Sequence, residues 1–299
     1  MRKWMLSLLL LILLAACSTN NLEDNVQANE NENNLEEKKE EVDKEPKEEN
    51  VKEEDRNVKE EERNVKEEER NVKEEDRVIK DEPIVEIEPE YYLDKDWGLK
   101  PIGDANPDVV LLTIDDAPDR YALEMANTLK QLNVKAIFFV NGHFIDTVEE
   151  QQVLKEIFNM GFEIGNHTMT HKSLRNLSEE EQYTEIIGLN DLIEEVLGER
   201  PKFFRAPFGQ NTEYASRLVE EEGMLLMNWT YGYDWEIDYK TKDTLTDIMV
   251  NTPLLTSGAN LLMHDREWTY EALEGIVIGL QEKGYEILDP KLIRIYGNN

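Results

Sequence analysis

Cysteine is almost absent from this chain of 299 residues, because Cys17 is the only one. A single thiol cannot form an intramolecular disulfide, and no other cysteine can serve as a nucleophile. The chain also lacks two catalytic signatures, the Gly-x-Ser-x-Gly turn and the Gly-x-x-x-x-Gly-Lys phosphate loop. Its chemistry must therefore come from other side chains.

Positive charge is also scarce, since 33 Lys and Arg stand against 66 Asp and Glu, giving a formal net charge of -33. A nucleic acid partner is excluded, because phosphate backbones select basic surfaces. The acidity is uneven along the chain. Residues 18–90 hold 29 acidic and 13 basic residues and few large apolar side chains, whereas residues 91–299 hold every Tyr and Phe.

Long apolar runs are missing except at the N-terminus. Arg2 and Lys3 precede the apolar residues 8–14, a pattern typical of an export signal. The run is too short for a comfortable transmembrane helix, which needs about 20 residues. Leu-Ala-Ala-Cys at 14–17 resembles a bacterial lipobox, so we expect Cys17 to be lipidated and the protein to be anchored at the extracellular face of the bacterial cell membrane. The alternative is a plain signal peptide with an incidental cysteine.

The segment 18–90 is interpreted as a charged spacer between anchor and domain. It contains a heptad repeat, Asn-Val-Lys-Glu-Glu-(Asp/Glu)-Arg, which occurs four times over residues 50–77. Each heptad offers one valine, whereas the seam of a coiled coil needs two apolar residues. Without a core to offset the ordering entropy, the segment is expected to be disordered or a fluctuating helix.

Residues 91–299 show apolar runs that alternate with amphipathic segments. We predict strands at 109–114, 136–141, 162–166, 202–206, 224–230, 260–264 and 285–288. We predict helices at 120–132, 148–160, 179–197, 212–222, 243–251 and 270–283. Such alternation implies βαβ units and a parallel sheet. About seven units in this length favour an α/β fold of the distorted (β/α) barrel type, preceded by the spacer.

Polar side chains gather where the predicted strands end, which is where barrel folds place their chemistry. These strand-end residues are Asp115, Asp116, His167, His171, Arg205, Phe208, Asp234, Trp235, His264 and Asp265. The chain has only four histidines, and three of them belong to this set. We therefore expect a site at the carboxyl ends of the strands.

Two histidines at i and i+4, His167 and His171, together with a carboxylate from another strand would form a site with open positions for water and substrate. Asp116 is the natural third ligand. Such a donor set suits a divalent metal, with Zn²⁺ preferred and Co²⁺, Ni²⁺ or Mn²⁺ as alternatives.

The remaining strand-end residues complete a hydrolytic set. Asp115 can take a proton from water, and His264 can protonate the leaving group. Arg205 can keep Asp115 ionised, and Asp234 is expected to orient Arg205. The backbone N–H of Phe208 is expected to help hold an oxyanion. The set describes metal-assisted hydrolysis of an amide or ester.

The same residues resemble the polysaccharide deacetylase family, the NodB-homology domain of carbohydrate esterase family 4. Five motifs occur in order: Thr-Ile-Asp-Asp-Ala at 113–117, His-Thr-Met-Thr-His at 167–171, Arg-Ala-Pro-Phe-Gly at 205–209, Asp-Trp at 234–235 and Leu-Met-His-Asp at 262–265. The resemblance implies a distorted (β/α) barrel and metal-dependent removal of acetyl groups from glycans. It gives Asp115 the role of base, Asp116 that of metal ligand and His264 that of acid.

Some positions depart from this pattern or leave alternatives open. Ala117 stands where the family has glycine, which would matter if position 117 needs φ > 0. Trp235 and Leu262 either wall an acetyl pocket or pack the core. Trp268 and Tyr270 either stack on a sugar or pack a helix start. His143 has no ligand spacing to the other candidate residues and is interpreted as structural or exposed.

Together these observations predict a membrane-anchored, metal-dependent N-deacetylase acting on cell-wall amino sugars of peptidoglycan. The expected partners are the glycan substrate and, through the lipid, the membrane, and we expect a monomer. Two alternatives remain: a weakly active or inactive lipoprotein that binds or stabilises the wall, and an esterase that removes O-acetyl groups with the same residues.

Overall fold

The computed structural model describes residues 87–295. The predicted signal segment, Cys17 and nearly all of the predicted spacer lie outside these residues. Within residues 87–295, no helix is both long enough and apolar enough to cross a membrane.

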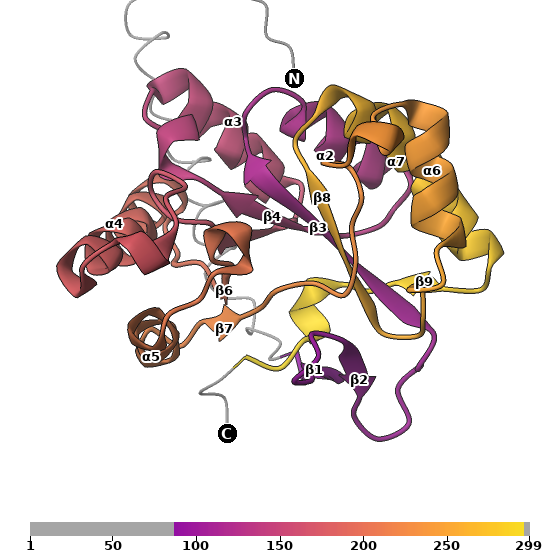
Figure 1. Ribbon diagram of the computed structural model, residues 1–299, viewed down its shortest axis with the longest axis horizontal. Helices are drawn as coiled ribbons and strands as arrows, with labels where there is room; N and C mark the ends of the chain where they lie inside the picture. Colours follow the sequence, from indigo (N-terminus) through magenta and orange to yellow (C-terminus); the bar gives the residue numbers. More distant parts are fainter. Residues whose placement is uncertain (1–86, 296–299) are drawn as a thin grey trace, which may run out of the picture. The chain divides into compact units, whose positions relative to one another are not determined.

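Seven strands form one parallel sheet, which confirms the predicted α/β barrel class (Figure 1). The strands are β3 (Val109–Ala117), β4 (Ile137–Val140), β5 (Glu163–Asn166), β6 (Phe203–Phe204), β7 (Leu225–Leu226), β8 (Ala259–His264) and β9 (Glu286–Ile287). Their order is β7-β6-β5-β4-β3-β8, and β9 pairs with the start of β3. β3 therefore pairs with three strands, β4, β8 and β9, so its end can meet side chains from strands on both sides.

Strand β3 forms at the centre because its residues are apolar on both faces. Residues 109–114 are fully or almost fully buried, as expected for a parallel strand covered on both sides. Alternate residues serve two cores. Leu112 and Ile114 pack in the cluster that faces the helices, whereas Val109 and Leu111 pack in the cluster inside the barrel.

Helices α2 (Ala122–Gln131), α3 (Val148–Asn159), α4 (Glu179–Leu197), α5 (Glu213–Glu221), α6 (Lys242–Asn251) and α7 (Glu267–Glu282) surround the sheet (Figure 1). A capping box opens α4, because the Ser178 side chain accepts the Glu181 N–H and the Glu181 side chain in turn accepts the Ser178 N–H. Gly198 ends this helix at φ 83°, a conformation that glycine adopts without steric cost.

One predicted strand is present but much shorter than expected. The segment predicted as a strand over 224–230 pairs with β6 only at β7 and then leaves that ladder. Its later residues meet the opposite sheet edge instead: the Thr230 N–H donates to Asn260 O, and the Leu262 N–H donates to Tyr231 O. Residues 227–231, here called the closing segment, thus join the two edges of the barrel without forming a regular strand.

A short antiparallel hairpin, β1 (Tyr91–Leu93) and β2 (Leu99–Pro101), had no counterpart in the predicted elements. Tyr91 and Leu99 belong to the apolar cluster inside the barrel, together with Ile137 and Phe203. The hairpin therefore covers the end of the barrel where the strands begin. The opposite end, where the strands finish, is left for the polar side chains.

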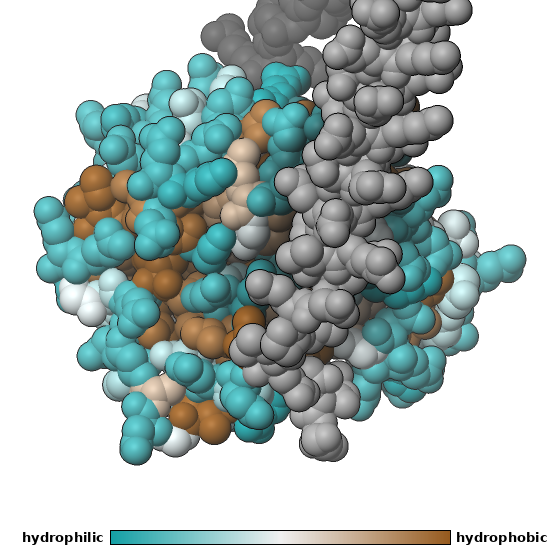
Figure 2. Space-filling view, turned by 180° about the vertical axis from the view of Figure 1, so that it is seen from behind, coloured by the Kyte–Doolittle hydropathy of each residue, from teal (hydrophilic) through white to brown (hydrophobic). Residues whose placement is uncertain are grey.

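On the face seen in Figure 2, hydrophobic residues form patches separated by hydrophilic ones wherever grey atoms do not cover the view. Large apolar side chains that are exposed include Phe208, Trp235 and Ile237, at 61%, 45% and 80%. Phe208 and Trp235 lie at the mouth of the cleft described next.

Candidate active site

A cleft of about 590 Å³ opens at the carboxyl ends of the strands, a size suited to a small-molecule or sugar ligand. It is lined by the predicted ligands, base and acid and by four aromatic side chains, Phe208, Trp229, Trp235 and Trp268. The structure thus brings the strand-end residues together, as expected from the parallel order of the strands.

Both aspartates of the first motif face this cleft because β3 is irregular there. Neighbouring residues of a regular strand point to opposite faces. Here Ile114 pairs with Phe138 and Ala117 with Val140, so β3 has one more residue than β4 over this stretch. This bulge, with Asp116 at φ 59°, turns both carboxylates toward the cleft.

Ala117 does not carry the strain that the sequence comparison suggested. Its φ is not positive, and the residue is fully buried in β3. The positive φ falls one residue earlier, on Asp116. Thr168, His171 and Phe208 also have positive φ, so four of the six such non-glycine residues within 87–295 lie in the motifs. Unfavourable backbone conformations often gather at functional sites in this way.

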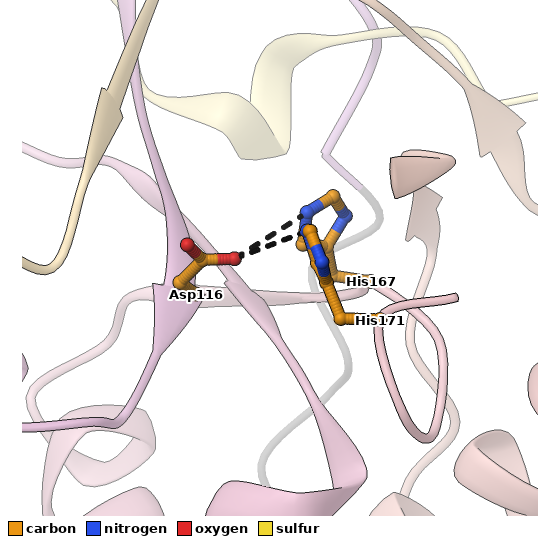
Figure 3. Close-up of side chains that lie close together, drawn as sticks. All are labelled: Asp116, His167 and His171. Atoms are coloured by element: carbon orange, nitrogen blue, oxygen red, sulfur yellow. Dashed lines mark ion pairs between the residues drawn. The ribbon is translucent and has the colours of Figure 1, made fainter. Parts of the chain in front are cut away.

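Asp116, His167 and His171 form a cluster in which one donor atom of each lies within 4.8 Å of the others (Figure 3). Asp116 Oδ1 is 3.8 Å from His167 Nε2 and 3.4 Å from His171 Nε2. His167 Nδ1 is 2.7 Å from Arg205 O. Because that carbonyl can only accept, Nδ1 carries the proton and Nε2 keeps its lone pair for a metal.

The chemistry of this donor set fits a divalent metal. Two imidazoles and one carboxylate leave open coordination positions for water and substrate. Burial by itself would raise the pKa of Asp116, but the nearby histidines and Arg266 outweigh it and hold that pKa below its ordinary value. Burial, with His167 beside it, lowers the pKa of His171 despite the opposing carboxylates. Both shifts favour the protonation states that bind a metal.

Asp115 lies beside this cluster and is tied to Arg205. Arg205 NH1 is 2.6 Å from Asp115 Oδ1, and both side chains are almost completely buried. Arg205 also donates to Thr113 Oγ1 and to Asn228 O, and its guanidinium lies over the Phe139 ring. The other carboxylate oxygen, Oδ2, faces His167 Nε2 at 3.5 Å. One oxygen of Asp115 is therefore held and the other faces the cleft.

His264 lies opposite Asp115 because the two residues are paired across β3 and β8. Paired residues of neighbouring strands project to the same side of the sheet. His264 Nδ1 is 2.7 Å from Asp234 Oδ1, which leaves Nε2 free. Burial works to lower the pKa of His264, but the carboxylate of Asp234 outweighs it and raises that pKa above its ordinary value.

The prediction that Asp234 orients Arg205 is wrong. Asp234 accepts from the backbone N–H and the ring of His264 and from Thr269 Oγ1, at 2.6, 2.7 and 2.8 Å. Arg205 is held by Asn228 O and Thr113 instead. The error arose because Asp234 lies in a loop, where no strand register fixes which neighbour it meets.

Of the apolar positions left open by the sequence, three line the cleft and one lies outside it. Trp235 is 5.7 Å from His264 between ring centroids and nearly perpendicular to it, and buried Leu262 lines the same cleft. Trp268 also lines the cleft and donates to Asp234 O. Tyr270 stacks on Tyr121 outside it.

Two further positions have settled places. The predicted exposure of His143 is confirmed, and its ring lies against Phe144. Phe208 packs its ring against His171, and its backbone N–H finds no acceptor within residues 87–295. Phe208 itself lines the cleft.

Several residues of the site had no role predicted from the sequence. Gly232 lets the loop pass close to β8, since a Cβ there would lie 2.4 Å from Leu262 O. The Asp265 carboxylate accepts backbone N–H groups of residues 119–121 at 2.6–2.9 Å. Arg266 binds Asp116. Arg266 lies two residues after the predicted acid at a strand end, and that position was the available signal.

Comparisons with known proteins give the family. A protein-family model described as polysaccharide deacetylase matches residues 102–227. Two peptidoglycan-N-acetylglucosamine deacetylases of Bacillus cereus are 30% and 32% identical over 190 and 187 residues, 61% and 60% of this chain. The match spans 66% of the length of the first and 67% of the second. The chain therefore belongs to the polysaccharide deacetylase family.

A solved structure adds a qualification about activity. The chain is similar, at 31% identity and a TM-score of 0.55, to a mutant of BA3943, described as a pseudoenzyme of the CE4 family with restored enzymatic activity. The match covers 61% of this chain and 65% of that one. Members of the family can thus share the fold and lack activity, so the residues of each site have to be judged individually.

Proposed function

We propose that the chain is a metal-dependent N-deacetylase that acts on acetylated amino sugars of peptidoglycan. One observation carries the proposal. Asp115, held by Arg205, lies beside the cluster of Asp116 and the two motif histidines, and it faces His264 across the β3–β8 pair. A base, a metal site and an acid are therefore available around one cleft. The named relatives from Bacillus cereus support peptidoglycan as the substrate class.

The chemistry follows from which atoms are free. A divalent metal held by Asp116, His167 and His171 would supply Lewis acidity to the acetyl group. Asp115 has one oxygen directed to the cleft and accepts a proton from the attacking water. His264, whose charged form is stabilised by Asp234, donates a proton to the amide nitrogen as the C–N bond breaks. Acetate and a free amino sugar are the products.

The cleft wall fits an acetylated sugar. Leu262 and Trp235 offer an apolar surface beside His264 for the acetyl methyl group. The exposed ring of Phe208 lies on the opposite side, against His171. The backbone N–H of Phe208 is free to donate to the acetyl oxygen as negative charge develops there.

Acetate release tests the proposal directly. The full chain, loaded with zinc, cobalt or nickel, is expected to release acetate from peptidoglycan or from N-acetylglucosamine oligomers. Asp115→Asn should reduce release by about 10³-fold, with Asp104→Asn as a matched control because Asp104 is exposed and lies outside the cleft lining. Absence of acetate release from every wall glycan at saturating metal would refute the proposal. An O-acetylated glycan assayed in parallel separates amide from ester hydrolysis.

The BA3943 structure favours one competing function, an inactive protein that binds the wall. In that case wall binding would persist with no acetate release, and His264→Ala would change nothing measurable. The complete set of base, ligands and acid in this chain favours activity.

We further propose that the protein is lipid-anchored through Cys17 at the outer face of the bacterial membrane, with residues 18–90 as a spacer. The Leu-Ala-Ala-Cys sequence behind an apolar run supports this. Cys17→Ser is expected to release the protein from the membrane fraction, and retention of that variant would contradict the anchor.

A further inference from the structure

Arg266 contacts the candidate metal ligand Asp116 directly. Its NH2 group lies 2.7 Å from Asp116 Oδ2, and its NH1 group lies 2.7 Å from Asp265 O and 3.6 Å from Asp119 Oδ2. The motif that ends at Asp265 does not include Arg266. The guanidinium is therefore fixed at several points, and its planar fork faces one particular oxygen of Asp116.

The residue before Arg266, Asp265, is held by several hydrogen bonds. The buried carboxylate of Asp265 accepts the backbone N–H groups of Asp119, Arg120 and Tyr121. These bonds tie the end of β8 to the chain that leads from β3 into α2. These bonds constrain where Arg266 lies relative to Asp116, although the two residues are 150 apart in the sequence.

The two oxygens of Asp116 have different partners. Oδ1 faces His171 and His167, whereas Oδ2 is occupied by Arg266. A carboxylate whose second oxygen is bound in this way can offer a metal only one oxygen. A carboxylate free to rotate could bind through both oxygens and take a coordination position that water or substrate needs.

We propose that Arg266 is a positioning residue that holds Asp116 as a single-oxygen metal ligand. The inference rests on the proposed function, because it assumes the metal site formed by Asp116, His167 and His171. The competing explanation is that Arg266 only offsets the negative charge of the adjacent aspartates. Under that explanation, removal of Arg266 would leave more negative charge at the site and strengthen cation binding.

Zinc affinity of the full chain without substrate distinguishes the two explanations. By competition with a chelator, Arg266→Gln is expected to bind zinc at least about tenfold more weakly, the usual effect of losing a partner that orients a ligand. Arg120→Gln is the matched control, because Arg120 lies 3.7 Å from Asp119 and has an exposed side chain. It should retain the wild-type affinity. Unchanged or tighter zinc binding by Arg266→Gln would overturn the proposal.

A spectroscopic measurement adds an independent outcome. With cobalt in place of zinc, the visible absorption of Arg266→Gln should change in position and intensity, because coordination number governs both. Arg266→Lys keeps the charge and lacks the fork, so it should also bind zinc more weakly than wild type. If Arg266→Gln does not fold, Arg266→Lys decides, and wild-type affinity and spectrum in that variant refute the positioning role.

These measurements are independent of acetate release. If wild type itself fails to bind zinc or cobalt, the metal-dependent function fails and the inference fails with it. If wild type binds metal and Arg266→Gln binds equally well, only the role of Arg266 is refuted.

Discussion

The two adjacent aspartates of β3 each pair with an arginine, but in different surroundings. Asp115 and Arg205 are both almost completely buried, with 2.6 Å between Oδ1 and NH1. Asp116 and Arg266 lie at the cleft, where their side chains are 13% and 35% exposed, with 2.7 Å between Oδ2 and NH2. The buried pair fixes the proposed base inside the barrel, whereas the accessible pair leaves one oxygen of Asp116 for the proposed metal. Burial, more than the charges themselves, gives two identical neighbours different roles.

The largest effects are expected from substituting the two aspartates one at a time. Asp115→Asn should reduce kcat/KM for acetate release by about 10³-fold, because general-base catalysis is lost, while zinc affinity stays near wild type. Asp116→Asn should abolish both zinc binding and acetate release. If Asp115→Asn lost zinc to the same extent as Asp116→Asn, the division of roles would be wrong.

Removal of the buried arginine tests the other half of the comparison. Arg205→Ala should lower the free energy of unfolding by about 3–5 kcal/mol, since it leaves Asp115 as an uncompensated buried charge. Arg266→Ala should lower it by about 1 kcal/mol or less, because that pair is partly exposed. Urea denaturation of the metal-free protein measures both, and equal losses would contradict the contrast.

A third pair, Asp234 with His264, should affect how activity depends on pH. His264 has a raised pKa because Asp234 stabilises its charged form, and it must be protonated to act as an acid. Activity should therefore persist to higher pH than the ordinary imidazole pKa allows. Asp234→Asn removes that charge, so the alkaline limb of kcat/KM should move to lower pH. An unmoved limb would mean that another group supplies the proton.

The smallest effect is expected at Ala117. Because its φ is not positive, Ala117→Gly relieves no strain and adds freedom to the unfolded chain. We expect a loss of about 0.5–1 kcal/mol in stability and no more than about a twofold change in kcat/KM. A large gain in activity would show that the family's glycine serves a purpose at this position that the backbone does not reveal.

The site could be predicted wherever it depends on strand ends. Asp115, His167, Arg205 and His264 follow apolar runs, and parallel strands bring their carboxyl ends to one edge. The partner of Asp234 could not be predicted, because a loop has no repeating geometry. The bulge at Asp115 and Asp116 was equally hidden, since a strand buried on both faces shows no alternation that would reveal an extra residue.

The fold shows the same division between regular and irregular parts. Seven parallel strands were predicted and found, because each has its own apolar run. The hairpin of β1 and β2 was missed, since three-residue strands are too short to show a period. Residues 224–230 were predicted as one strand because of their apolar run, yet only Leu225–Leu226 pair with β6 as a strand, and Thr230 hydrogen-bonds to the opposite edge.

The closing segment sets the spacing of two walls of the barrel. Residues 227–231 connect the wall that carries Arg205 to the wall that carries His264, and the Asn228 carbonyl accepts from both Arg205 and Asn260. A regular strand would fix the spacing of those walls by its ladder, whereas here individual hydrogen bonds do so. Substitution or insertion in these five positions is thus expected to change the width of the cleft, and with it the fit of bulkier glycans, together with the position of Arg205.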